Sequence, residues 1–173
     1  TIERERLLVI ADRSELGVSP AQDLPHHVIL LPHVPEDRPP VPDDRAFLLW
    51  KFWREVFHGR VHAELAERLE HGDLTERQIR DWVREMGAGT FFEVRQVLHR
   101  DDMLQHASDR VAAFVEFAAV TLELRHFASS ERPYYFPAIE SWSRVDAILD
   151  AAFPHNEWHL QTRPREAPDV CPE

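Results

Sequence analysis

The sequence has one cysteine, Cys171, so no disulfide can form within the chain, and a reducing compartment is the simpler expectation. It also lacks a run of about 20 apolar residues of the kind that spans a bilayer. The longest candidate, 111–122, is interrupted by Glu116. No basic flank with an apolar signal core stands near the first residue. We therefore expect a cytoplasmic protein with no membrane partner.

Basic residues are also scarce: Lys and Arg total 20 against 31 Asp and Glu, which gives a formal net charge of −11. This charge repels a phosphate backbone, so we expect no nucleic-acid partner. Only five glycines are present, and the close pair Gly87 and Gly89 lacks the lysine of a phosphate-binding loop. No Gly-x-Ser-x-Gly element occurs either. The sequence thus predicts no catalytic residue and no organic cofactor, and it leaves enzymatic activity undecided.

Apolar side chains are abundant, because 43% of the residues are hydrophobic and five Trp and ten Phe are among them. This content can fill one core without disulfides. Apolar spacing and helix caps predict an all-α fold, an irregular bundle of about five helices. The expected helices are 43–71, 75–87, 90–100, 108–128 and 138–153, with capping boxes at Thr75/Gln78 and Thr90/Glu93.

The two ends of the chain have a different character. Residues 1–42 contain two short apolar runs, 7–10 and 28–31, and then a proline-rich connector. We predict that both runs are extended and form an arm or a short β-hairpin, packed on the helical body or paired with a partner's sheet edge. Residues 154–173 are rich in proline and charge and are predicted to be a tail. The expected domains are 1–42, 43–153 and 154–173.

Polar residues in the most apolar helix require an explanation. Glu116, Glu123 and His126 fall within roughly 80° of one another on the predicted helix 108–128. Glu123 and His126 also form a Glu-x-x-His element, and a second one stands at Glu55 and His58, with His62 one turn further on. Two such elements on buried helices resemble the ligand pattern of ferritin-like di-iron proteins.

This resemblance implies a site for iron, manganese or zinc, built from Glu55, His58, His62, Glu123 and His126. Glu116, Glu93 or Glu85 could complete it, although the middle helices are too short to supply a pair of long carboxylate-bearing partners. The alternative is structural: Glu–His or Glu–Arg pairs that fix helix register, or a thin solvated stripe. His155 and His159 lie four residues apart but lack the Glu placement of zinc proteases.

The function that the sequence favours is non-catalytic: a helical interaction or assembly domain, part of a larger bacterial protein or complex. We expect a protein partner or self-association, with the N-terminal arm and the segment 134–136 as contact surfaces. Tyr134, Tyr135 and Trp158 are the expected exposed aromatic residues. The metalloprotein is the alternative function.

Overall fold

The computed structural model describes residues 2–19, 21–31, 42–104, 109–169 and 171, and at 42–44 the course of the backbone alone. The chain divides into two compact units, Thr1–Pro39 and Pro40–Glu173. Each unit is described by itself below. Most of the predicted proline-rich connector lies outside the described residues.

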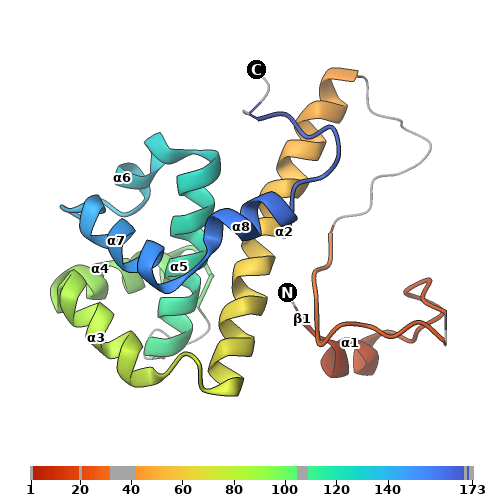
Figure 1. Ribbon diagram of the computed structural model, residues 1–173, viewed down its shortest axis with the longest axis horizontal. Helices are drawn as coiled ribbons and strands as arrows, with labels where there is room; N and C mark the ends of the chain where they lie inside the picture. Colours follow the sequence, from red (N-terminus) through yellow and green to blue (C-terminus); the bar gives the residue numbers. More distant parts are fainter. Residues whose placement is uncertain (1, 20, 32–41, 105–108, 170, 172–173) are drawn as a thin grey trace. The chain divides into compact units, whose positions relative to one another are not determined.

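The N-terminal unit contains a two-stranded antiparallel sheet and a short helix (Figure 1). Strand β1 (Ile2–Glu3) pairs with strand β2 (His27–Val28), so that Ile2 faces Val28 and Glu3 faces His27. Helix α1 (Arg4–Ile10) follows β1 directly. The Arg4 guanidinium donates a hydrogen bond to the Leu24 carbonyl oxygen at 3.0 Å, which ties the helix to the segment before β2.

The prediction that residues 7–10 are extended is wrong, because they form the second half of α1. A four-residue apolar run has no periodicity long enough to distinguish a strand from a helix. The preceding residues Arg4, Glu5 and Arg6 are good helix formers and extend the run to seven helical residues. The two strands therefore pair across an intervening helix and do not form the expected hairpin of two apolar runs.

The second unit is helical, which confirms the predicted all-α class in its broad sense. Its long helix α2 (Pro42–His71) ends at the residue predicted from the sequence, and Gly72 follows it with a φ of +80°. The other elements, labelled where space allows in Figure 1, are α3 (Glu76–Met86), α4 (Ala88–Arg100), α5 (Arg110–Phe127), a 3₁₀ turn η1 (Ser129–Glu131), α6 (Arg132–Tyr135), α7 (Trp142–Ala152) and α8 (His155–Gln161).

Helix α3 begins with the predicted capping box. The Thr75 hydroxyl accepts a hydrogen bond from the Gln78 backbone N–H, and the Gln78 side chain accepts one from the Thr75 backbone N–H. The second predicted box is wrong, because α4 begins at Ala88 and Thr90 lies inside it. Gly87, with a φ of +102°, ends α3 and is also the N-cap of α4, so no separate cap residue is needed.

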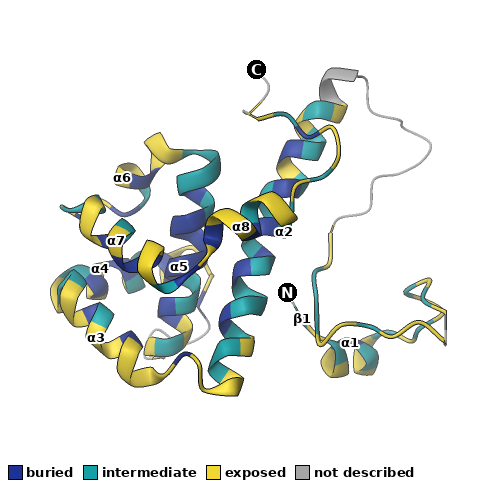
Figure 2. Cartoon of the chain, viewed as in Figure 1, coloured by how far each residue is buried: buried dark blue, intermediate teal, exposed yellow. Residues whose placement is uncertain are grey.

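Helix α5 carries much of the core of the helical unit, and Figure 2 shows buried residues, in dark blue, alternating with intermediate ones along it. It packs against α2, α3, α4 and α6. Its N-cap is Asp109, whose carboxylate accepts a hydrogen bond from the Ala112 backbone N–H at 2.9 Å. Nine residues of α5 are buried, among them Phe114, Phe117 and Leu122. By contrast, Phe47 in the first turns of α2 is 45% exposed.

The segment predicted as a tail contains helix α8, which packs on α2. His155 and Trp158 of this helix are buried, at 1% and 3% exposure, so the expectation of an exposed Trp158 is wrong. Trp158 belongs to the main apolar cluster together with Phe153. The composition of the segment did not reveal this, because two buried side chains among many polar residues are enough to anchor a two-turn helix.

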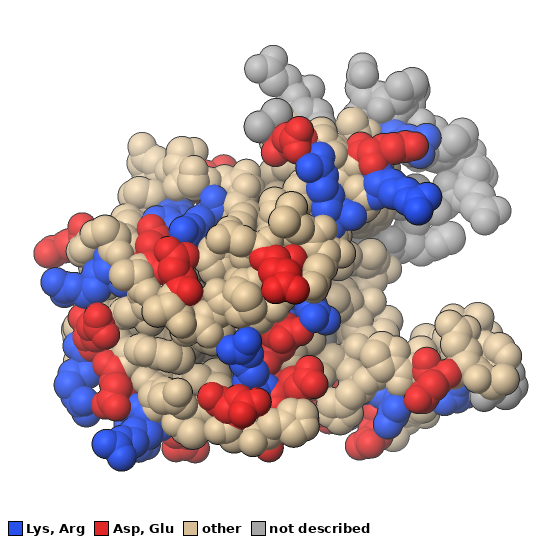
Figure 3. Space-filling model, viewed as in Figure 1, with Lys and Arg blue, Asp and Glu red and all other residues tan. Residues whose placement is uncertain are grey.

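Charged side chains of both signs are intermixed on the face seen in Figure 3. On α3, Arg80 lies 3.6 Å from Glu76, and Arg84 lies 2.7 Å from Asp81, as its interleaved charges indicate.

Within the described part of the chain, no helix combines the length and apolarity needed to cross a bilayer.

Candidate metal centre

A stripe of polar side chains runs along the contact between α2 and α5. His58 and His62 are four residues apart on α2, and Glu116 and Glu123 are seven residues apart on α5. These spacings correspond to one and two helical turns, so each pair projects from one side of its helix. Because α2 and α5 lie side by side, the two pairs meet (Figure 1).

Three of these side chains bring metal-ligating atoms close together. The Nε2 atoms of His58 and His62 are 3.0 Å apart. The two carboxylate oxygens of Glu116 face them, Oε1 at 3.5 Å from His58 Nε2 and Oε2 at 3.1 Å from His62 Nε2. The ligand atoms of all three residues lie within 4.8 Å of one another. We call His58, His62 and Glu116 the three-ligand group.

Glu123 binds the ring nitrogen of His58 that points away from His62 and Glu116, and Arg54 in turn binds Glu123. The Nδ1 atom of His58 lies 2.6 Å from Oε2 of Glu123, and the other oxygen of Glu123 accepts a hydrogen bond from Nε of Arg54. A carboxylate is a hydrogen-bond acceptor, so the proton of this contact is on Nδ1. In a neutral His58 ring, the Nε2 lone pair is therefore directed toward His62 and Glu116.

The charges within the stripe are strongly coupled. Burial by itself lowers the pKa of His58, but its hydrogen bonds to Glu116 and Glu123 and their negative charges outweigh burial and raise this pKa to about 9. Burial raises the pKa of Glu116, but hydrogen bonds with His58 and His62 and the charges of both rings lower it to about 2. The pKa of Glu123 is also lowered, against the effect of burial, by His58 and Arg54.

Three of the predicted ligands lie outside the three-ligand group: Glu123, whose contact with His58 is described above, Glu55 and His126. The Glu55 carboxylate is 36% exposed and lies 4.0 Å from the Lys51 ammonium, and it is not a member of the three-ligand group. His126 contacts His155 and His159. The two Glu-x-x-His elements thus contact each other through His58 and Glu123, whereas Glu55 lies by Lys51 and His126 lies by His155. Glu116, which the sequence suggested only as a completing ligand, lies in the three-ligand group, and Glu93 is exposed.

His126 belongs to a second histidine cluster, which links α5, α7 and α8. Its Nε2 atom is 2.9 Å from Nδ1 of His155, and Nε2 of His155 is 2.7 Å from Oδ1 of Asp150. The His159 ring is stacked on the His126 ring, with centroids 4.2 Å apart. Burial, followed by the charges of His159 and His155, lowers the pKa of His126 to about 3. We call these four residues the α8 cluster.

Part of the α8 cluster can be predicted from the sequence, because His155 and His159 are four residues apart and share one side of a helix. No sequence pattern indicates that His126 of α5 contacts both of them. The described residues contain no group of three metal ligands that includes a member of this cluster. Hydrogen bonds join His126, His155 and Asp150 of this cluster in a network, with Asp150 at its end.

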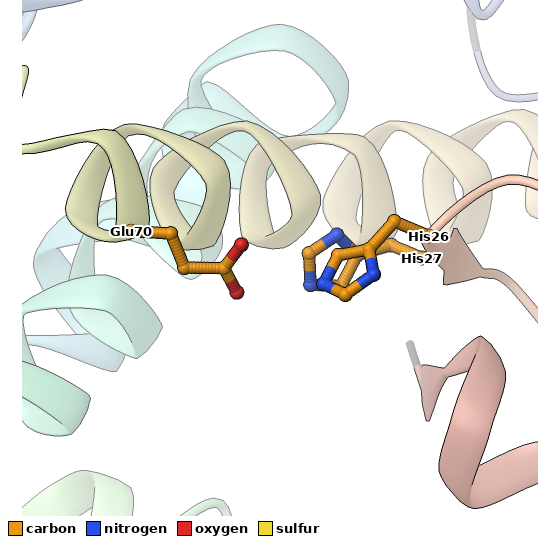
Figure 4. Close-up of side chains that lie close together, drawn as sticks. All are labelled: His26, His27 and Glu70. Carbon is orange, nitrogen blue, oxygen red and sulfur yellow. The ribbon is translucent and has the colours of Figure 1, made fainter.

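The N-terminal unit carries a further histidine pair at strand β2. The rings of His26 and His27 meet edge to face, with centroids 4.6 Å apart, and Figure 4 shows them next to each other. Strand pairing places them there, because the His26 carbonyl oxygen accepts a hydrogen bond from the Arg4 backbone N–H at 2.7 Å. We assign no ligand to this pair.

No protein-family model, curated protein or solved structure matches the chain. Function must therefore be inferred from the side chains themselves.

Proposed function

We propose that the helical unit binds one divalent transition-metal ion of the zinc, iron or manganese class through the three-ligand group. The observation that carries this proposal is the spacing of its ligand atoms. Metal–ligand bonds of about 2.0–2.2 Å place neighbouring ligands about 3.3–3.6 Å apart in a tetrahedron and about 2.8–3.1 Å apart in an octahedron. The 3.0 Å between the two imidazole nitrogens and the 3.1 Å from His62 to Oε2 of Glu116 fall in the octahedral range. The 3.5 Å from His58 to the other oxygen of Glu116, Oε1, falls in the tetrahedral range.

The types of ligand also suit such an ion. Two imidazoles and one carboxylate form the set used by many mononuclear zinc and non-haem iron sites. The contact between Glu123 and His58 supplies the outer carboxylate that usually orients a metal-bound histidine. This function develops the metalloprotein alternative of the sequence, with one ion and with Glu116 as the carboxylate ligand in place of Glu55, Glu123 and His126.

The test is elemental analysis by plasma mass spectrometry of untagged protein purified without chelator. We expect about one equivalent of zinc, iron or manganese in the wild-type protein, and loss of most of it in His62→Ala and Glu116→Gln. His71→Ala, at the exposed end of the same helix, is the matched control and should keep its metal. Circular dichroism establishes that each variant is folded. A wild-type protein without metal, even after anaerobic reconstitution, contradicts the proposal.

A second candidate function, protein interaction, is favoured by the apolar surface of the N-terminal unit. Four of its large apolar residues are exposed: Val9 at 89%, Ile10 at 71%, Leu30 at 57% and Leu31 at 41%. A sheet of two-residue strands is too small to be stable without further packing. We propose that these side chains contact a partner or a second copy of the chain.

Sedimentation velocity of the wild-type protein and of a Val9→Ser/Ile10→Ser variant tests this second function. Self-association that is lost in the variant supports it. If the wild-type protein is a monomer, a pull-down from the native lysate with both proteins decides the question. If wild type and variant capture the same proteins, the exposed apolar residues of the N-terminal unit are not the surface that binds the partner.

A further inference from the structure

Among the described residues, the three-ligand group offers three ligands to the proposed ion, and Glu123 of the same stripe is bound to other partners. Glu123 is the only other member of the stripe that could ligate, but both its oxygens are occupied, one by His58 Nδ1 and the other by Arg54. Among the residues that the structure describes, no fourth His, Cys, Asp or Glu joins the three-ligand group. The stripe therefore provides fewer ligands than a closed site needs.

The number of protein ligands separates two kinds of metal site. Structural zinc sites are closed by four side chains, whereas catalytic sites have three and keep a position for water or substrate. Ions that prefer octahedral coordination leave still more positions to exchangeable ligands. We infer that the ion bound by His58, His62 and Glu116 keeps an open coordination position at which small anionic oxygen donors, such as carboxylates and hydroxamates, replace water. This inference rests on the proposed metal site.

Access from solvent supports this inference. The side chains of His58 and His62 are each 24% exposed and that of Glu116 is 13% exposed. By comparison, the imidazole of His155 in the α8 cluster is 1% exposed. The three-ligand group thus reaches the surface of the helical unit, and a small ligand can enter without unfolding a helix.

The charge of the site selects the class of ligand. A divalent ion with two neutral imidazoles and the Glu116 carboxylate has a net charge of +1. Glu123 and Arg54 next to it offset each other. An anion that binds the open position neutralises the remaining charge, whereas a cationic ligand is repelled. Hydroxamates have the further advantage of two oxygen donors, which can occupy two positions of a site that expands its coordination.

Cobalt(II) is the probe that separates this inference from the proposed function. The full chain, freed of metal, is titrated with Co²⁺ alone while its visible absorption is recorded, and acetohydroxamate or acetate is then added. We expect Co²⁺ bands that saturate near one equivalent and then shift, saturably, with either anion. Glu55→Gln is the control, because Glu55 lies on the same helix but is not a member of the three-ligand group. This variant should give the same Co²⁺ bands and the same anion-induced shift. In the His62→Ala/Glu116→Gln variant, neither the bands nor the shift should appear.

Three other outcomes of this titration would contradict either the open coordination position, the proposed metal binding or the assignment of the ligands. If Co²⁺ binds near one equivalent but neither anion changes its bands at any concentration, the coordination is closed and the open position is refuted, while metal binding stands. If Co²⁺ gives no bands and no metal is retained by the native protein, the proposed function fails and the inference fails with it. An anion-induced shift that persists in the double variant would place the ion elsewhere and refute the assignment to these residues.

Discussion

The Nδ1 atom of His58 on α2 lies 2.6 Å from Oε2 of Glu123 on α5. This contact fixes the tautomer of a neutral His58 and directs its other nitrogen toward His62 and Glu116. The geometry is that of an outer-sphere carboxylate behind a metal-bound imidazole. This polar contact between α2 and α5 thus orients His58 toward the other two proposed ligands.

Replacing Glu123 tests that support. We expect Glu123→Gln to weaken metal binding about 10- to 100-fold with the stoichiometry unchanged, because the ring of His58 loses its charged partner while all three ligands remain. Competition with a chromophoric chelator measures the affinity. Glu64→Gln, which removes a carboxylate paired with Arg60 on α2, is the control and should bind as wild type does. Equal affinity in both variants would deny Glu123 a positioning role.

Glu55 separates the proposed site from the ligand set predicted by the sequence. Its carboxylate lies by Lys51 and is not a member of the three-ligand group. We therefore expect Glu55→Ala to keep the metal content of the wild-type protein and to change the free energy of unfolding by less than about 0.5 kcal/mol, since an exposed pair contributes little. Elemental analysis and urea unfolding measure these quantities. Loss of the metal would restore Glu55 as a ligand.

The α8 cluster predicts a loss of stability in acid. The pKa of His126 is lowered from 6.5 to about 3 in the folded protein, first by burial and then by the charges of His159 and His155. At a pH between about 3 and 6.5, His126 therefore binds a proton in the unfolded chain but not in the folded protein. The corresponding stability is therefore present above about pH 6.5 and is lost as the pH falls toward 3.

Urea unfolding at pH 7 and pH 5, in the presence of a chelator, measures this effect. His126→Gln should show a smaller drop in the free energy of unfolding between the two pH values than the wild-type protein, whatever its stability at pH 7. His71→Gln changes an exposed histidine of α2 and should keep the wild-type drop. An unchanged drop in His126→Gln would mean that other groups carry the acid sensitivity.

A buried arginine makes Asp146 important for stability. The guanidinium of Arg132 donates to both carboxylate oxygens of Asp146, at 2.8 and 3.0 Å, and lies 4.3 Å from the centroid of the Trp142 ring. Asp146→Ala leaves this cation without its bidentate partner, and we expect a loss of about 2–3 kcal/mol in the free energy of unfolding. Asp81→Ala breaks an exposed pair with Arg84 and should cost less than about 0.5 kcal/mol.

The two threonines of the predicted capping boxes form a matched pair. Thr75 caps α3, so Thr75→Ala should lower the free energy of unfolding by about 1 kcal/mol. Thr90 lies inside α4, where alanine is the better helix former. Thr90→Ala should therefore be nearly neutral in the same unfolding experiment. Equal losses in both variants would contradict the position of α4.

The local sequence was sufficient to predict some helix boundaries and insufficient to predict others. The capping box at Thr75 is a contact between residues three apart, so its prediction needed no knowledge of the rest of the fold. The box at Thr90 fails because Gly87 has a positive φ, which a composition of threonine and glutamate does not reveal. Residues 7–10 and helix α8 were misassigned because short apolar content is ambiguous until its packing partner is known.

For the candidate site, the sequence placed acids and histidines on two apolar helices, because helical spacing alone sets which residues share a face. It could not decide which faces meet. Only the packing of α2 on α5 brings Glu116 to His58 and His62, and only the position of α8 brings His155 and His159 to His126. The reason is physical: a helix fixes neighbours within one turn, whereas the azimuth of one helix against another depends on the whole packed interface.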